Sequence, residues 1–185
     1  NPRLSDEVDS WNDATFLNKA KLCIKGDITN TAILLLGKLE AEALISPSVA
    51  RITWILKGED GTERSYEHFS CPFLLSVEKV NKKIRNLKYR YIKDGSLFPE
   101  EVDMYDPFVI REALHNCIAH QDYSLQGRIQ VVENEEGSLI FTNKGKFLPG
   151  SIEKVIQADS PREYYQNKFL ADAMVNLNMM DTIGS

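Results

Sequence analysis

Three polar side chains recur at every fourth position of an otherwise apolar segment, residues 111–123. They are Glu112, Asn116 and His120. At about 100° per residue, each step of four turns only about 40° around an α-helix, so the three side chains lie in one row. A carboxylate one turn from a carboxamide is suited to holding a hydrated metal ion and a water molecule beside a phosphate. A solvated helix face without a ligand is the alternative.

The row needs a helix to hold it, and the surrounding sequence predicts one. Asp106 and Pro107 are typical of an N-cap followed by the first helical residue. Apolar residues point away from the row, toward a core: Leu114, Cys117 and Ile118. We expect the helix to end near Ala119.

Residues 111–123 resemble the N-box of the GHKL ATPases, a superfamily that includes gyrase, the histidine kinases and MutL. The form is that of bacterial RecG-related transcriptional regulators, which read approximately R-E-A-L-x-N-A-x-x-H-R-D-Y. This chain departs from the pattern at Cys117 and at Gln121, where an Arg is common. Loss of the Arg removes a cation that would face a phosphate. It weakens the case for catalysis more than the case for the fold.

The resemblance implies an ATP site with magnesium. Glu112 would be the general base that polarises water, and Asn116 the magnesium ligand. His120 and Asp122 are typical of the family, but their role stays open. Both also suit a helix end, since the dipole favours a His near a C-terminus and an Asp accepts backbone N–H bonds in turns.

A second motif follows two predicted antiparallel strands, residues 128–133 and 138–142. Asn143-Lys144-Gly145 resembles the D-x-G loop of the superfamily, in the N-x-G form common among the relatives. The resemblance implies that Asn143 contacts adenine and that Gly145 lets the base approach the backbone. An amide makes such a hydrogen bond without charge. An ordinary Asn-x-Gly turn that leaves a strand is the alternative.

The last residues, 181–185, resemble the start of the glycine-rich lid that closes over the phosphates in relatives. Gly184 is the only glycine there. Such loops bind phosphate through successive N–H groups, which one glycine cannot present, so we expect weak nucleotide binding. Asn1 is not a natural translation start, and we therefore expect a fragment.

Upstream, residues 26–38 resemble the last part of the Schlafen-like AAA (Alba-like) domain that precedes the GHKL-like unit in these regulators. We therefore expect an α+β protein of two parts. Residues 1–70 would be the end of the Alba-like domain, and residues 71–185 a truncated GHKL-like α/β sandwich, with a mixed or antiparallel sheet covered by helices.

Hydrophobic spacing and turn residues predict the remaining elements. Helices are expected at residues 13–25, from Pro72 onward, at 151–157 and at 167–179. Hairpins are expected from residues 51–57 with 64–69, and from 89–92 with 96–102 across Asp94-Gly95. The apolar run 29–37 is too short for its periodicity to separate a strand from a helix.

The net charge of −5 hides one basic window, residues 79–93, which holds seven cations and no acid. The rest of the chain therefore carries −12. A basic stretch with interleaved aromatic residues suits contact with nucleic acid through Lys79, Lys82, Lys83 and Arg85. The solvent face of an amphipathic helix is the alternative, and the acidic remainder indicates that any main DNA contact lies outside this chain.

Composition limits the class of protein. The chain is 43% hydrophobic and 26% charged, which is typical of a globular protein. No apolar run approaches the roughly 18 residues of a membrane span. The three cysteines are far apart, without zinc-ligand spacing, which favours reduced thiols in the cytoplasm.

Together these features predict a fragment of a RecG-related, ATP-binding transcriptional regulator, with weak ATPase activity possible. The alternative, from another class of function, is a non-catalytic module for dimerisation or DNA positioning. A homodimer is compatible with the nucleotide-binding regulator and with the non-catalytic module. The sequence contains no G-x-x-x-x-G-K-[ST] loop, which argues against a helicase.

Overall fold

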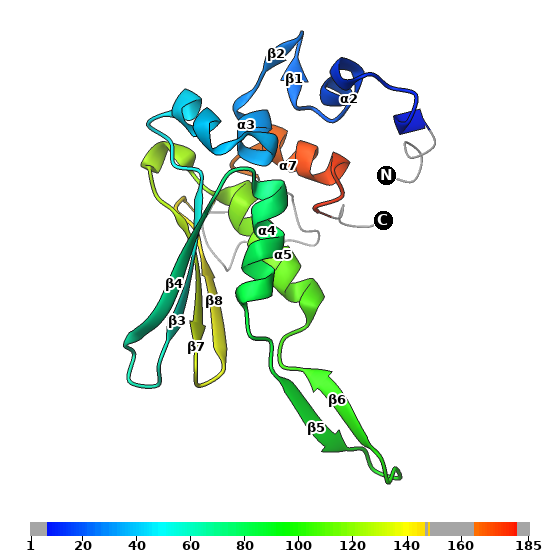
Figure 1. Ribbon diagram of the computed structural model, residues 1–185, viewed down its shortest axis with the longest axis vertical. Helices are drawn as coiled ribbons and strands as arrows, with labels where there is room; N and C mark the ends of the chain where they lie inside the picture. The colour runs from blue at the N-terminus through cyan, green and yellow to red at the C-terminus, as the bar shows by residue number, and fades with distance from the viewer. Residues whose placement is uncertain (1–6, 147, 149–164, 181–185) are drawn as a thin grey trace.

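A computed structural model describes residues 7–146, 148 and 165–180. A four-stranded sheet has the order β4 (Glu63–Ser70), β3 (Arg51–Lys57), β7 (Ile129–Asn134) and β8 (Ser138–Thr142). β3 and β7 run parallel, and the other neighbours run antiparallel. Helices lie beside this mixed sheet (Figure 1), so the predicted α+β class is confirmed.

Two long helices cover one face of the sheet: α4 (Phe73–Lys83) and α5 (Pro107–His120). The inward side chains of β7 alternate with less buried ones, as a half-covered sheet requires. Ile129 and Val131 are buried there, and the next inward residue, Glu133, is buried as well. The core therefore lies between the sheet and these two helices.

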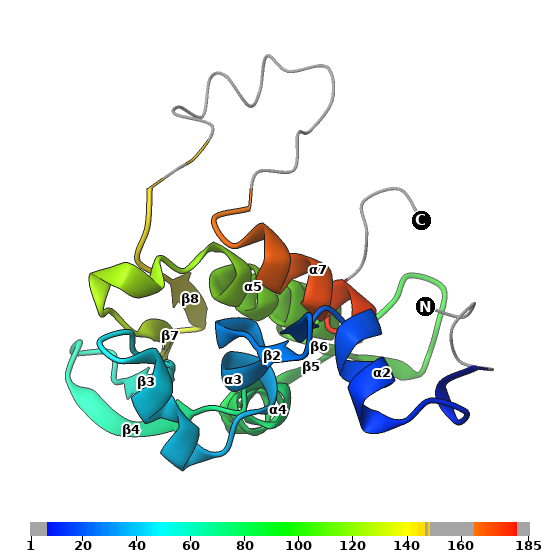
Figure 2. The ribbon, with the colours of Figure 1, turned by 90° about the horizontal axis from the view of Figure 1, so that it is seen from above.

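A smaller layer lies beyond one end of the sheet. It contains α2 (Asp13–Lys19), α3 (Asn30–Leu36), the 3-10 helix η1 (Leu39–Ile45), α7 (Lys168–Asn176) and the short hairpin of β1 (Cys23–Ile24) and β2 (Asp27–Ile28). From above, α3 lies beside α4, and α7 lies beside α5 (Figure 2). The undecided run 29–37 is thus a helix, and the Thr29 hydroxyl caps it by accepting the Ala32 N–H.

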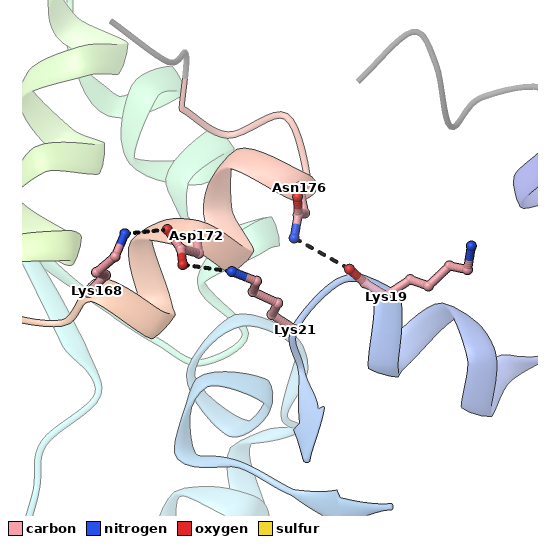
Figure 3. A network of polar contacts seen from close by, with 5 residues as sticks. All are labelled: Lys19, Lys21, Lys168, Asp172 and Asn176. Atoms are coloured by element: carbon pink, nitrogen blue, oxygen red, sulfur yellow. Dashed lines mark hydrogen bonds and ion pairs between the residues drawn. The ribbon is translucent and has the colours of Figure 1, made fainter. Parts of the chain in front are cut away.

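The N-terminal residues are tied to α7 by a polar network (Figure 3). Asp172 forms ion pairs with Lys21 at 2.7 Å and with Lys168 at 3.2 Å. The Asn176 amide donates to the Lys19 carbonyl at 3.4 Å. In addition, β3 and β4 share one sheet with β7 and β8. The predicted boundary between residues 70 and 71 therefore lies within a continuous structure, because the parallel β3–β7 pairing joins the two parts.

Two predicted helices end earlier than expected. α2 ends at Lys19 and α7 at Asn176, and a residue with positive φ follows each, Lys21 at 59° and Asn178 at 58°. This left-handed conformation cannot continue a right-handed helix. The hairpin of residues 51–70 and the helices from residues 73 and 107 are confirmed. The helix predicted at 151–157 falls outside the described residues.

The second predicted hairpin is present and projects away from the sheet and helices (Figure 1). It consists of β5 (Lys88–Ile92) and β6 (Pro99–Asp103), which pair antiparallel. Gly95, at φ 85°, supplies the left-handed residue of the turn. None of the described helices is long and apolar enough to cross a bilayer.

Candidate functional site

The helix that carries the polar row begins as its sequence predicts. The Asp106 carboxylate accepts the Phe108 N–H at 2.8 Å, and Pro107 occupies the first turn, where its missing N–H costs nothing. Ile110, Leu114 and Ile118 on one face are buried. That packing fixes the rotation of α5 and thereby sets the direction of Glu112 and Asn116.

Glu112 and Asn116 are both half-buried and contact each other directly. The Asn116 amide Nδ2 donates to Glu112 Oε1 at 3.0 Å. This bond orients both groups. It uses one carboxylate oxygen and an amide hydrogen, while the carboxamide oxygen and the second carboxylate oxygen retain acceptor capacity for a cation or a water molecule.

His120, the third member of the row, lies at the C-terminal end of α5. Its ring stacks on Tyr165, with 5.2 Å between ring centroids and 26° between planes. Burial lowers the pKa of His120 below its usual value, because removal from water disfavours the imidazolium. The neutral ring is therefore favoured at pH 7.

Asp122 acts within its own turn. One carboxylate oxygen accepts the Ser124 N–H at 3.0 Å and the Ser124 hydroxyl at 2.5 Å. These bonds cap a 3-10 turn, η2 (Tyr123–Leu125). The same residue's backbone N–H donates to the Lys144 carbonyl at 2.7 Å. Asp122 thus shapes the junction between α5 and the loop after β8.

Gln121 lies at the centre of this junction, a structural role that its sequence context did not predict. Its side chain is only 1% exposed. Nε2 donates to the Gly127 carbonyl at 2.8 Å, while Oε1 accepts the Lys144 N–H at 2.7 Å. An Arg has no acceptor atom and could not replace the second bond. Gln121 therefore bridges two loops.

We expect Gln121→Ala to lower the free energy of unfolding by about 1–3 kcal/mol, because two buried hydrogen bonds lose their partner. Gln121→Glu keeps the acceptor for Lys144 but points a carboxylate at the Gly127 carbonyl, so it should destabilise as well. Urea denaturation measures both. The exposed Gln166→Ala is the matched control, and equal stability of Gln121→Ala and this control would contradict the bridging role.

The Asn143-Lys144-Gly145 loop packs directly on the end of α5. Gly145 has φ 155°, and a Cβ there would come within 3.1 Å of the His120 carbonyl oxygen. Asn143 is exposed, and its amide donates to the Lys144 carbonyl at 3.3 Å. The structure thus brings Gly145 next to His120 and Asp122. Glu112 lies about 12 Å farther back along the helix, at 1.5 Å per residue.

Arg111, next to Glu112, joins α5 to the residues after α7. Its guanidinium donates to the carbonyls of Asn178 and Met179, both at 3.1 Å. The sequence pattern carried no signal of this contact, because the partner carbonyls belong to the backbone. Gly184 and the rest of the lid-like motif lie outside the described residues.

A cavity of about 490 Å³ opens on another side of α5, between α4 and the end of α7. Its lining mixes apolar side chains with five polar or charged ones: Glu78, Asn81, Arg111, His115 and Asn178. Glu112 and Asn116 belong to a different face of the helix. Among the described residues, no group of three His, Cys, Asp or Glu side chains is arranged to hold a metal ion. A magnesium ion at the row would therefore need ligands from a nucleotide and from water, which is its usual manner of binding.

The basic window is balanced in space by acids distant in sequence. Lys83 pairs with Glu67 at 2.5 Å, and Arg85 with the buried Glu133 at 2.7 Å. Lys79 and Lys82 are exposed on α4. The two cations of β5, Lys88 and Arg90, lie opposite acidic residues of β6. Lys93 follows the strand. Two of the four predicted nucleic-acid contacts are thus already in ion pairs.

Comparisons with known proteins add a likeness in fold. No family model matches the chain, and no curated protein matches it. The crystal structure of the DIP2311 protein from Corynebacterium diphtheriae is similar, with a TM-score of 0.72 over 97% of this chain. The two sequences are 16% identical, so the match concerns the fold alone. The chain spans 35% of the length of that protein.

Proposed function

We propose that this chain is part of an ATP-binding transcriptional regulator that holds a nucleotide along the polar row of α5. The observation that carries the proposal is the half-buried Glu112–Asn116 pair, joined at 3.0 Å on a helix fixed by its apolar face. The resemblance of residues 111–123 to an N-box supplies the ligand class.

The acceptor atoms of the row suit a magnesium–phosphate group. Asn116 would hold the ion through its carboxamide oxygen, and the bond to Glu112 turns the amide so that its N–H faces the carboxylate. The bound ion would supply neutralisation of phosphate charge. Glu112 would accept a proton from water, which is the task of a general base. Slow hydrolysis follows from this assignment.

The loop after β8 would receive the other end of the nucleotide. Gly145 lies against the His120 carbonyl, and the absence of a side chain leaves its backbone open to close approach. Asn143 is exposed beside it and has an amide for hydrogen bonding to a base. DNA would be bound by regions outside this chain. A reducing cytoplasm suits the three free cysteines.

A second candidate is a non-catalytic module that dimerises or positions a DNA-binding regulator without nucleotide. The specific observation in its favour is the use of Gln121 as a buried bridge, where an Arg is common in the family pattern. Asn143 also bonds back to its own loop. Magnesium dependence separates the two candidates, since a module without nucleotide has no reason to show it.

We expect Asn116→Ala to abolish the magnesium dependence of ATP-analogue binding, because it removes the proposed ligand oxygen. The affinity without magnesium should change little. Asn116→Asp keeps an oxygen ligand and should retain the dependence, while the exposed Asn18→Ala on α2 is the control. Calorimetric titration of each variant with and without magnesium measures the ratio of the two affinities. Equal magnesium dependence in wild type and Asn116→Ala would refute the assignment.

A further inference from the structure

The hairpin of β5 and β6, with the residues that flank and connect the strands, forms an arm over residues 87–103. It leaves the body between α4 and α5 and extends away from it (Figure 1). Every residue of both strands is exposed. A two-stranded hairpin alone is marginally stable in water, and an exposed apolar face adds to that cost. The arm therefore lacks the packing that such a hairpin normally requires.

The two faces of the arm differ in character. On one face, Arg90 lies opposite Glu101 and pairs with it at 2.6 Å, and Lys88 lies opposite Asp103. On the other face, Tyr89 lies opposite Val102, and the Tyr91 hydroxyl donates to the opposite Glu100 at 3.0 Å. Because a strand alternates its side chains, Leu87 falls on the side of Tyr89. One face is thus charged and internally balanced, and the other is mainly apolar.

The apolar side chains of the arm are open to solvent to an unusual degree. Leu97 is 93% exposed and Phe98 80% exposed, both at the tip. The other apolar side chains of the arm are between 44% and 67% exposed: Leu87, Tyr89, Tyr91, Ile92 and Val102. Single exposed apolar residues are ordinary, whereas a continuous set on one element marks an interaction surface.

The base of the arm is held rigidly, so the apolar face has a fixed direction. Asn86 and Tyr105 exchange two hydrogen bonds of 2.9 Å, from the amide to the Tyr105 carbonyl and from the Tyr105 N–H to the amide oxygen. The Met104 N–H donates to the Leu87 carbonyl at 2.8 Å. Just before them, Arg85 is bonded to the buried Glu133. Such preorganisation lowers the ordering cost of binding.

We propose that the arm docks on the arm of a second copy of this chain, apolar face to apolar face, and so forms a two-fold homodimer. In a two-fold interface the same patch meets itself, which suits a face that is mainly apolar. Residues 88–103 carry a net charge of −1. Two copies therefore repel each other little, and the arm offers no positive surface to a nucleic acid.

The exposed aromatic side chains supply a large part of the area that a dimer interface needs. Tyr89, Tyr91 and Phe98 are 53%, 44% and 80% exposed. With 150–250 Å² for a fully buried aromatic side chain, these three offer roughly 350 Å² per copy. Two arms thus bury roughly 700 Å² through aromatic rings alone, nearly half of the roughly 1,600 Å² of a standard interface. Leu87 and Val102 extend the same face, whereas Ile92 lies opposite Pro99 on the charged face.

The test is the molecular mass of the whole chain in solution, by sedimentation equilibrium over a range of concentrations. We expect the wild type to reach twice its 21.0 kDa. The double variant Tyr89→Asp and Phe98→Asp should raise the dissociation constant at least about 100-fold, because each substitution places charges on both sides of a symmetric contact. Leu44→Asp makes the same chemical change at a residue 75% exposed on η1, and should leave the dimer intact.

Two outcomes would overturn the proposal: a wild type that stays at 21.0 kDa at the highest concentration reached, or a double variant that dimerises as tightly as Leu44→Asp. Thermal unfolding monitored by circular dichroism confirms that both variants are folded. Hydrogen exchange gives an independent readout, since the amides of residues 87–103 should exchange more slowly as the wild-type concentration rises. An exchange rate of these amides that does not change with concentration would also contradict docking through the arm. This inference does not depend on nucleotide binding.

Discussion

Replacement of Glu112 by glutamine is expected to remove most ATP hydrolysis while nucleotide affinity stays nearly unchanged. A glutamine still offers an oxygen to the Asn116 amide, now bonded at 3.0 Å, but it cannot accept a proton from water. General-base catalysis contributes roughly 100- to 10,000-fold to a rate, and the loss should fall in that range. Phosphate release under single-turnover conditions measures the rate, and analogue titration measures the affinity.

The matched control for Glu112→Gln is Glu136→Gln in the exposed β7–β8 turn, which should leave the rate unchanged. Glu112→Ala should lose as much activity as Glu112→Gln, because both lack the base. Equal and negligible turnover in the wild type and all three variants would instead favour the non-catalytic module.

Glu133→Ala should lower the free energy of unfolding by about 2–4 kcal/mol, the largest stability effect we expect. The carboxylate is only 4% exposed and accepts the Trp54 indole N–H at 3.1 Å and the Arg85 guanidinium at 2.7 Å. Its removal leaves the buried indole N–H without an acceptor and the guanidinium without a counter-charge. The Arg85 side chain is 38% exposed and can reach water, which limits the loss.

Urea denaturation measures the free energy of unfolding of Glu133→Ala and of Glu101→Ala. The comparison distinguishes the loss of a buried contact from the loss of a surface contact. Glu101 pairs with Arg90 on the exposed arm at 2.6 Å, and surface pairs contribute little. We expect little change in Glu101→Ala. A Glu133→Ala protein as stable as Glu101→Ala would contradict the role of Glu133 in joining α4 to the sheet.

Elements set by local sequence were predictable here. The Asp106-Pro107 pair and the apolar spacing after it determine where α5 begins and which way it faces. The hairpins could be predicted because their paired strands are neighbours in the chain. For the same reason the polar row could be predicted on one side of a single helix. These inferences need no knowledge of distant residues.

Features that depend on distant contacts escaped prediction. The parallel pairing of β3 with β7 joins residues 77 positions apart in the chain, and no local pattern indicates it. In the sequence, Glu133 is only the polar last residue of a predicted strand. Its two partners, Arg85 and Trp54, are distant in the chain. The positive charge of the basic window had no visible counter-charge in the sequence, because Glu67 and the acids of β6 lie outside the window. Gln121 likewise bridges two loops that only the fold brings together.

The most direct test of the nucleotide site is a titration of the ¹⁵N-labelled chain with a non-hydrolysable ATP analogue and magnesium, followed by NMR, which detects weak binding at a known place. We expect magnesium-dependent shifts at the Asn116 side-chain amide and at the backbone amides of Asn143 and Gly145. The amides of residues 87–103 should stay unchanged. An absence of shifts along α5 at saturating analogue, or shifts confined to the cavity between α4 and α7, would contradict the proposed nucleotide site.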